Sequence, residues 1–202
     1  MLNRELVERE LPREGLLVFN ESLLRNQELS GAHFEEARLD QCKLENITFS
    51  EVEIDESKVT DCIFNKCNFA GVRLNEAFFS RTEFVRSRLQ GLQIDAAILK
   101  DVNFKSCKLQ SSNFRFAKLK DVVFEDCDLS EADFVGAELE NVTFKNCNVA
   151  SVEFSQARLK VVKLSGSNIE NIRITADSSR GLIVDTGQAL YLASLFGLSI
   201  ED

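Results

Sequence analysis

Apolar residues recur along this chain with a period of five. Every fifth residue from Phe19 to Ile174 is Leu, Phe, Ile or Val, which gives 32 consecutive matches without an insertion. Neither an α-helix, with a period of 3.6, nor a flat strand, with a period of two, produces this spacing. A strict short repeat is typical of a solenoid, in which each unit buries its apolar side chain only against stacked neighbours. The pattern predicts one elongated domain over residues 17–176.

A second restricted position lies two residues before each of these centres. From Leu17 to Ile172 it holds Ala, Cys, Ser, Thr or Val in 27 of 32 cases, and neither position ever holds Asp, Glu, Lys or Arg. Because an unpaired charge is costly to bury, both positions are predicted to point inward. The residue two after the centre is Gly or Asn ten times, which favours a tight turn with a positive φ. These ten residues are Asn26, Gly31, Asn46, Gly71, Gly91, Gly136, Asn141, Asn146, Gly166 and Asn171.

Like residues also recur at a spacing of twenty, which predicts the number of sides. Five Phe run from Phe64 to Phe144 in steps of twenty, and three Cys run likewise from Cys107 to Cys147. Twenty residues are four pentads, so we expect a square coil in which like residues stack in columns. The 32 pentads make eight coils, and at about 4.8 Å per stacked strand the rod is roughly 38 Å long.

Individual pentads carry a family signature. The units ADFVG at 132–136 and CDLSE at 127–131 resemble the A(D/N)LXX pattern of the pentapeptide-repeat family. The resemblance covers residues 17–176 and implies an all-β fold, a right-handed quadrilateral β-helix. The chain departs from the family pattern in having few Asp or Asn just before the centre.

Both ends of a solenoid need caps, because they expose core and unpaired strand edges. Residues 1–16 place a few Leu and Val among alternating Arg and Glu up to Pro12, which predicts a short amphipathic capping helix. In the C-terminal segment, residues 177–202, Asp185 with Gln188 indicates a capping box and Gly197 a helix stop. A short, largely apolar α-helix is therefore predicted between them.

The apolar surface of this C-terminal helix exceeds what one cap needs, and the surplus could meet another copy. The run from Gln188 to Leu198 also resembles the C-terminal module of the bacterial quinolone-resistance and mycobacterial fluoroquinolone-resistance pentapeptide proteins. In those relatives the module joins two rods end to end, so the resemblance implies a homodimer. The interface residues that we expect are Leu192, Leu195, Phe196 and Leu198.

Side chains that could support catalysis or metal binding are few. All six Cys occupy the small inward position, without a CxxC pair or a His at zinc spacing, so we expect buried thiols rather than a zinc site or disulfides. The single histidine, His33, has no motif partner, and no Walker, GxGxxG or GxSxG motif is present. The sequence predicts a protein that is not an enzyme and needs no cofactor or metal. The Cys positions are 42, 62, 67, 107, 127 and 147.

Charge narrows the choice of partners. The net charge is −9, which disfavours direct nucleic-acid or membrane binding, since both require a basic surface. With no membrane span or signal peptide in the sequence, we expect a cytoplasmic protein. The side centred on 34, 54 and 74 carries nine acids and three bases, whereas the side centred on 24, 44 and 64 carries seven bases and four acids. The predicted partner-binding residues are Glu35, Glu36, Glu53, Asp55, Glu56, Glu76 and Asp95.

Two functions compete at this stage. The resemblance to the quinolone-resistance proteins implies a DNA mimic that binds DNA gyrase, a type II topoisomerase, and modulates or protects it. Such a mimic needs a rod of duplex width, a run of carboxylates and end-to-end dimerisation, and the chain offers a form of each. The alternative is a non-enzymatic interaction scaffold that binds some other protein through one flat side.

Overall fold

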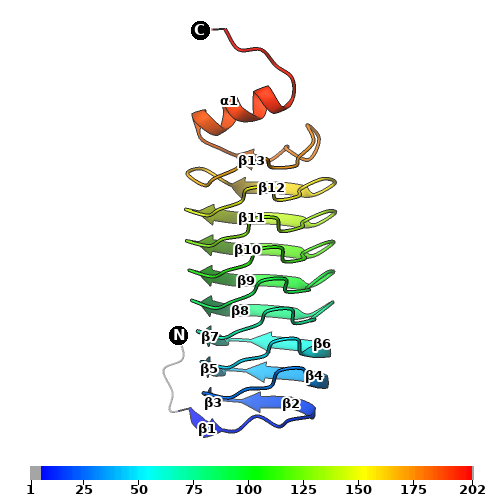
Figure 1. Cartoon of the computed structure of the whole chain (residues 1–202), viewed down its shortest axis with the longest axis vertical. Helices are drawn as coiled ribbons and strands as arrows, with labels where there is room; N and C mark the ends of the chain where they lie inside the picture. The colour runs from blue at the N-terminus through cyan, green and yellow to red at the C-terminus, as the bar shows by residue number, and fades with distance from the viewer. Residues whose placement is uncertain (1–5, 202) are drawn as a thin grey trace.

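The computed structural model describes residues 6–201 of the chain, apart from the side chain of Asp55. Its strands all pair in parallel and stack into a rod with the helix at the C-terminal end (Figure 1). Equivalent residues are twenty apart, as in the pairs Leu119↔Leu139 and Phe124↔Phe144. The fold is thus the predicted quadrilateral β-helix of about eight coils. The elements are β1 (Val7–Arg9), β2 (Gly15–Asn20), β3 (Ser22–Arg25), β4 (His33–Asp40), β5 (Lys43–Glu45), β6 (Glu53–Thr60), β7 (Ile63–Asn65), β8 (Phe78–Val85), β9 (Ile98–Lys105), β10 (Lys118–Glu125), β11 (Glu138–Lys145), β12 (Arg158–Lys163), β13 (Leu182–Ile183) and α1 (Thr186–Leu195).

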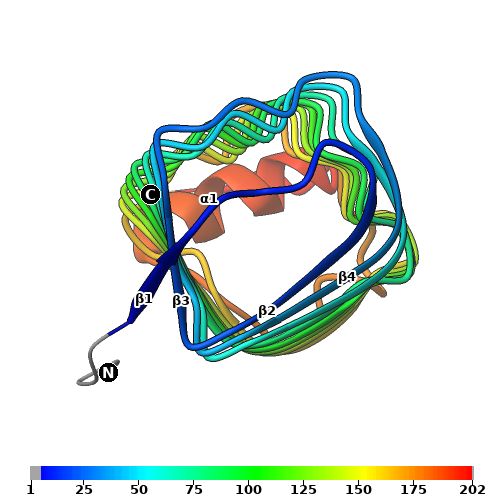
Figure 2. The ribbon, with the colours of Figure 1, turned by 90° about the horizontal axis from the view of Figure 1, so that it is seen from below.

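The view along the axis shows a four-sided coil (Figure 2). We number the sides by their centres, which recur every twenty residues: side 1 from 24, side 2 from 29, side 3 from 34 and side 4 from 19. Strands β8 to β11 each run across sides 4 and 1, while sides 2 and 3 are joined by single bridges such as Asn113↔Asp133. The chain visits the sides in order, so the acidic side 3 lies opposite the basic side 1.

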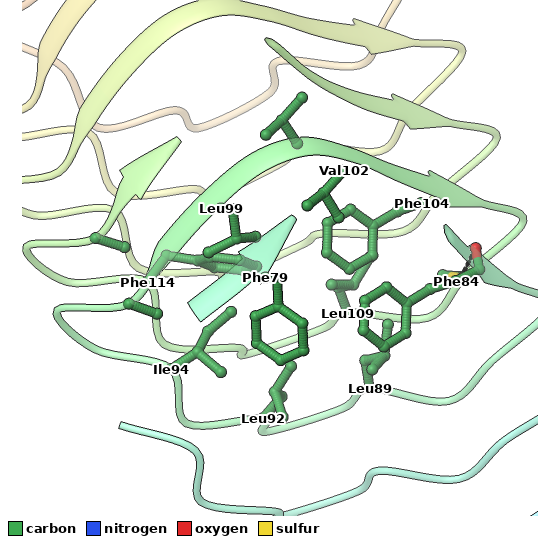
Figure 3. Close-up of a cluster of buried hydrophobic side chains, with 14 of the residues drawn as sticks. Phe79, Phe84, Leu89, Leu92, Ile94, Leu99, Val102, Phe104, Leu109 and Phe114 are labelled. Carbon is green, nitrogen blue, oxygen red and sulfur yellow. Dashed lines mark hydrogen bonds between the residues drawn. The ribbon is translucent and has the colours of Figure 1, made fainter. Parts of the chain in front are cut away.

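Aromatic columns fill the centre of the rod. The side-1 rings of Phe84, Phe104, Phe124 and Phe144 stack with centroids 4.8 to 4.9 Å apart and planes within 8° of parallel. Side chains from all four sides converge on the axis, as in the cluster around Phe79 and Phe104 (Figure 3). Each buried Phe therefore contacts its own column and the neighbouring sides. The inward direction of the centres, predicted from the period of five, is confirmed by their burial.

The corners of the coil fall at the residue two after each centre. All ten predicted Gly and Asn residues have a positive φ there, between 52° and 80°. Residues of many other types share the conformation, including Phe116 at 56° and the β-branched Val161 at 57°. Glu36 does not, so β4 passes from side 3 to side 4 without the left-handed corner that forms at Glu76, where φ is 58°.

The inward Cys and Ser of side 2 form a hydrogen-bond ladder. The thiol of Cys127 donates to the carbonyl of Phe104 at 3.4 Å and accepts from the backbone N–H of Cys107 at 3.4 Å. The hydroxyl of Ser87 does the same with Phe64 and Cys67. All six Cys are buried and free, as predicted, and burial raises the pKa of the Cys67 thiol to about 12. The thiols thus bridge successive coils as well as filling space.

A glutamine side chain hydrogen-bonds the backbone at each end of the rod, although Ile47 separates Gln27 from the ladder, which begins at Cys67. At the C-terminal end, Nε2 of Gln188 donates to the carbonyls of Leu164 at 2.8 Å and Ser167 at 2.7 Å. At the N-terminal end, Oε1 of Gln27 accepts from the N–H of Leu11 at 2.6 Å, and its Nε2 donates to the carbonyl of Arg9 at 3.2 Å. Gln27 was one of the five exceptions to the small inward pattern. Its amide joins side 2 to the N-terminal segment, which explains why a long polar side chain stands there.

The predicted N-terminal helix is wrong for the residues that the structure describes; residues 1–5 lie outside them. Residues 7–9 form β1, which pairs with β3 in the register Val7↔Ser22. Pairing satisfies backbone groups on the open edge of β3, which a helix lying across the end would leave unpaired. Leu11 supplies the buried apolar side chain of this segment.

The C-terminal helix is confirmed with its signals. Asp185 and Gln188 form the capping box, and Gly197, with a φ of 80°, follows the C-cap residue Phe196. The backbone N–H groups of Gln188 and Gly166 hold the pKa of the Asp185 carboxyl below its ordinary value. Because Asp185 also accepts from Gly166 at 3.0 Å, the cap fixes the helix to the last coil.

Candidate partner-binding surfaces

The predicted acidic residues fall into three parallel columns on side 3 and its edge. The column nearest side 4 holds Glu36, Glu56 and Glu76, one per coil. The flat face carries Glu35 and Asp95 in a second column and Glu53 in a third. Asp55 belongs to the second column, but its side chain lies outside the described ones. The structure therefore brings three of the seven residues into one line along an edge.

Ion pairs neutralise some of these carboxylates. Glu53 pairs with Arg73 at 3.0 Å, and Glu36 pairs with Arg38. Among the side chains that the structure describes, no ion pair involves Glu35, Glu56, Glu76 or Asp95. No paired base therefore neutralises these four acids.

A hollow accompanies the acidic column. Glu36, Glu56 and Glu76 line it together with Arg38, Lys58, Ser57 and Asn75. It lies where β4 lacks the left-handed corner, so it follows from the backbone as well as from the side chains. The side chains lining it are polar or charged, which suits an ionic partner rather than an apolar ligand.

Acids on the basic side 1 are arranged differently. Glu125 lies between Lys105 at 3.6 Å and Lys145 at 2.5 Å, and Lys145 is the main cause that holds the pKa of Glu125 below its ordinary value. Glu45 likewise pairs with Arg25 at 2.8 Å. Ion pairs between coils neutralise these two of the four acids of side 1, so side 3 presents the more available negative charge.

The four predicted dimer residues divide into two groups. Leu192 is buried against the last coil, with 7% of its surface exposed. Leu195, Phe196 and Leu198 are exposed by 44%, 38% and 63%. The helix thus uses one face as a cap and leaves an apolar end on the rod, to which Leu190 and Ile200 also contribute.

One exposed aromatic was not singled out from the sequence. Phe116 is 56% exposed at the same edge as the acidic column. The signal was present, since thirteen of the sixteen Phe occupy centres and Phe116 is one of three that do not. The other two are Phe78 and Phe196.

Other site types find little support. Within the described part of the chain, no three His, Cys, Asp or Glu side chains gather as a metal site would require. No helix there is long and apolar enough to span a bilayer.

Family comparison agrees with this geometry. A family model described as a pentapeptide repeat region matches residues 57–134 and 97–174, and a second, described as pentapeptide repeats, matches 19–54 and 28–65. The chain belongs to the pentapeptide-repeat family. No curated protein matches it at a significant level.

Solved pentapeptide-repeat structures share the fold. Full-length QnrB1, a plasmid-mediated fluoroquinolone resistance protein, is 19% identical with a TM-score of 0.52, over 88% of this chain and 100% of that one. Rfr23 from the cyanobacterium Cyanothece 51142 is 18% identical with a TM-score of 0.43, over 64% and 88% of the two chains. HetL, involved in heterocyst differentiation regulation in Nostoc sp. strain PCC 7120, is 17% identical with a TM-score of 0.37, over 85% and 91%. At these identities the likeness concerns the fold.

Proposed function

We propose that this pentapeptide-repeat protein is a non-enzymatic DNA mimic that binds the basic DNA-binding surface of a type II topoisomerase, DNA gyrase. In this role it would modulate or protect the enzyme and could confer resistance to quinolones or toxins. The observation that carries the proposal is the column Glu36, Glu56 and Glu76 on the edge of side 3. Stacked strands repeat about every 4.8 Å, a spacing similar in order of magnitude to that of phosphates along one DNA strand.

The distribution of charge across the rod supports an oriented approach. Side 3 is acidic and side 1, on the opposite face, is basic. A transverse dipole of this kind turns the acidic side toward a positively charged groove during encounter. The likeness to QnrB1 supports the same partner class only through the shared fold.

The proposal is tested by charge reversal. We expect the double variant Glu56→Lys, Glu76→Lys to bind purified bacterial gyrase more weakly than the wild type does. It should also change the supercoiling activity of gyrase less than the wild type does, while its own melting temperature stays the same. The matched control is Glu131→Lys with Glu170→Lys, which changes the net charge equally on side 2. Raising salt from about 50 to 200 mM should also weaken the wild-type complex, because screening shortens the reach of exposed charges.

A wild-type protein that neither binds gyrase nor alters supercoiling at low salt would refute the mimic. The interaction scaffold, with a different protein partner, would then be the better interpretation. Equal losses in the test and control variants would refute the assignment of the acidic edge, since they would report net charge alone.

We also propose that two rods dimerise end to end through Leu195, Phe196 and Leu198. Their exposure leaves an apolar surface that a second copy would cover, while Leu192 acts indirectly by holding the helix on the last coil. Light scattering should give a dimer for the intact chain and a folded monomer for Leu195→Glu with Leu198→Glu. A monomeric intact chain would contradict this arrangement.

A further inference from the structure

Phe116 is held in a conformation that large side chains seldom adopt. Its φ is 56°, at the corner between sides 3 and 4, and 56% of its surface is exposed. A left-handed backbone costs a residue with a Cβ roughly 1–2 kcal/mol. More than half of the side chain is exposed, so burial within the rod offsets this cost only in part.

The neighbouring residues fix the ring in place. It lies over Gly136 of the next coil, where a Cβ would stand 2.6 Å from Cδ1 of Phe116. The guanidinium carbon of Arg115 is 5.6 Å from the ring centroid, and Arg115 is anchored to Asp133 by an ion pair of 2.9 Å. A ring already confined in this way loses little conformational entropy when a partner covers it.

The ring continues the line of the acidic column. Glu36, Glu56, Glu76, Ala96 and Phe116 follow one another at this edge in steps of twenty. Four coils at about 4.8 Å place the ring roughly 19 Å from the first carboxylate. Ile98, 44% exposed, pairs with Lys118 in the adjacent strand, two residues from Phe116, and widens the apolar end of the line. A partner seated along this edge meets carboxylates first and an aromatic ring next.

We infer that Phe116 is the apolar anchor of the partner-binding edge, and that the partner is a protein whose basic groove carries an apolar pocket beside it. Negative charge from Glu56 and Glu76 selects the basic groove, and the preordered ring selects the pocket. Aromatic anchors in pockets dominate many protein interfaces, whereas a surface that only imitated phosphates would make no use of the ring. The inference rests on the proposed function and adds a specificity determinant to it.

The experiment uses the intact chain and purified bacterial DNA gyrase. Phe116→Ala should weaken binding about tenfold, the size of a moderate hot-spot loss, and the loss should persist at about 200 mM salt. Val161→Ala is the matched control. Val161 is also apolar, is 45% exposed and has a left-handed backbone conformation, but it lies at another corner of the coil. This control variant should bind like the wild type. Phe116→Leu, which keeps apolar bulk at the corner, gives a second comparison if the Ala variant melts early.

The outcomes separate the two proposals. Wild-type binding that is unchanged by Phe116→Ala and Phe116→Leu overturns the anchor and leaves the acidic mimic standing. Equal weakening by Val161→Ala overturns the anchor too, since the effect would then not be local. A wild type that does not bind gyrase overturns both. If Phe116→Ala instead shifts the monomer–dimer equilibrium in light scattering, the ring contacts a second copy and the anchor is again overturned.

Discussion

The first coils and the central coils follow the same pentad pattern but pack differently. From β8 to β11 the Phe column of side 1 is continuous, with ring centroids about 5 Å apart, and a second stacked column on side 3 begins at Phe114. In the first coils the side-1 column begins with Leu24 and Leu44, and a cavity of about 30 Å³ lies between the sides. Leu at a centre matches the five-residue repeat, but it fills less of the interior of the coil than Phe does.

Two inward serines differ in the same direction. Ser57, in the first coils, has a buried Oγ without a hydrogen-bond partner and lines the cavity. Ser112, at the small inward position of a central pentad on side 3, shares its hydroxyl proton between the carbonyls of Leu89 at 2.8 Å and Leu109 at 2.7 Å. The corner missing at Glu36 and the register shift between Gly15 and Leu16 belong to the first coils too. The irregular backbone and the unpaired buried hydroxyl thus occur where the side chains of neighbouring coils pack less closely.

This comparison implies that the proposed binding edge joins a loosely packed half to a rigid one. Glu36 and Glu56 lie on the first coils, and Phe116 on the central ones. In a solenoid each coil contacts only its neighbours, so local stability can differ along the rod. The acidic end of the edge can therefore adjust to a partner while the aromatic end stays fixed.

The largest expected effect comes from truncating a central ring. Phe124→Ala removes a side chain that stacks on both neighbours and should cost about 3–5 kcal/mol of unfolding free energy. Phe49→Ala, which borders the existing cavity and stacks on Phe69 alone, should cost less because the open site can collapse. Urea denaturation followed by circular dichroism compares them. Equal costs would mean that the cavity does not loosen the first coils.

Smaller changes in the free energy of unfolding are expected at the two serines, and the two changes should have opposite signs. Ser112→Ala removes a hydroxyl whose proton is shared between two buried carbonyls and should lose about 1–2 kcal/mol, whereas Ser57→Ala removes an unpaired buried hydroxyl and should gain up to about 1 kcal/mol. Both changes delete one oxygen at the same repeat position, so each serves as the control of the other. Thermal melts would contradict the packing difference if both variants were destabilised alike.

Sequence patterns predicted which residues point inward and where the chain turns, because period, charge exclusion and Gly or Asn are local signals. They did not predict the cavity or the absence of a left-handed corner at Glu36. Both depend on whether side chains from all four sides together fill the interior of one coil. The strand β1 was missed because residues 7–9 lie outside the pentad register, and its partner Ser22 is fifteen residues away instead of twenty. The spacing of twenty also predicts the columns of acidic residues on side 3, but it did not predict which of them are ion-paired, since that depends on side-chain conformation.

The smallest expected effect lies at the boundary between the two regions. Arg81 of β8 donates to both carboxylate oxygens of Asp61 in the coil below, at 2.7 and 2.6 Å, and holds the pKa of Asp61 below its ordinary value. A depressed carboxyl pKa stabilises the fold above the ordinary pKa, and this contribution is lost as pH falls through the folded value. Since the pair is largely exposed and screened, Asp61→Asn should cost less than about 1 kcal/mol at pH 7. The difference from wild type should shrink in urea melts as the pH falls below the ordinary carboxyl pKa, and also in 1 M salt. A difference that changed with neither pH nor salt would show that geometry, rather than charge, joins the first coils to the central ones.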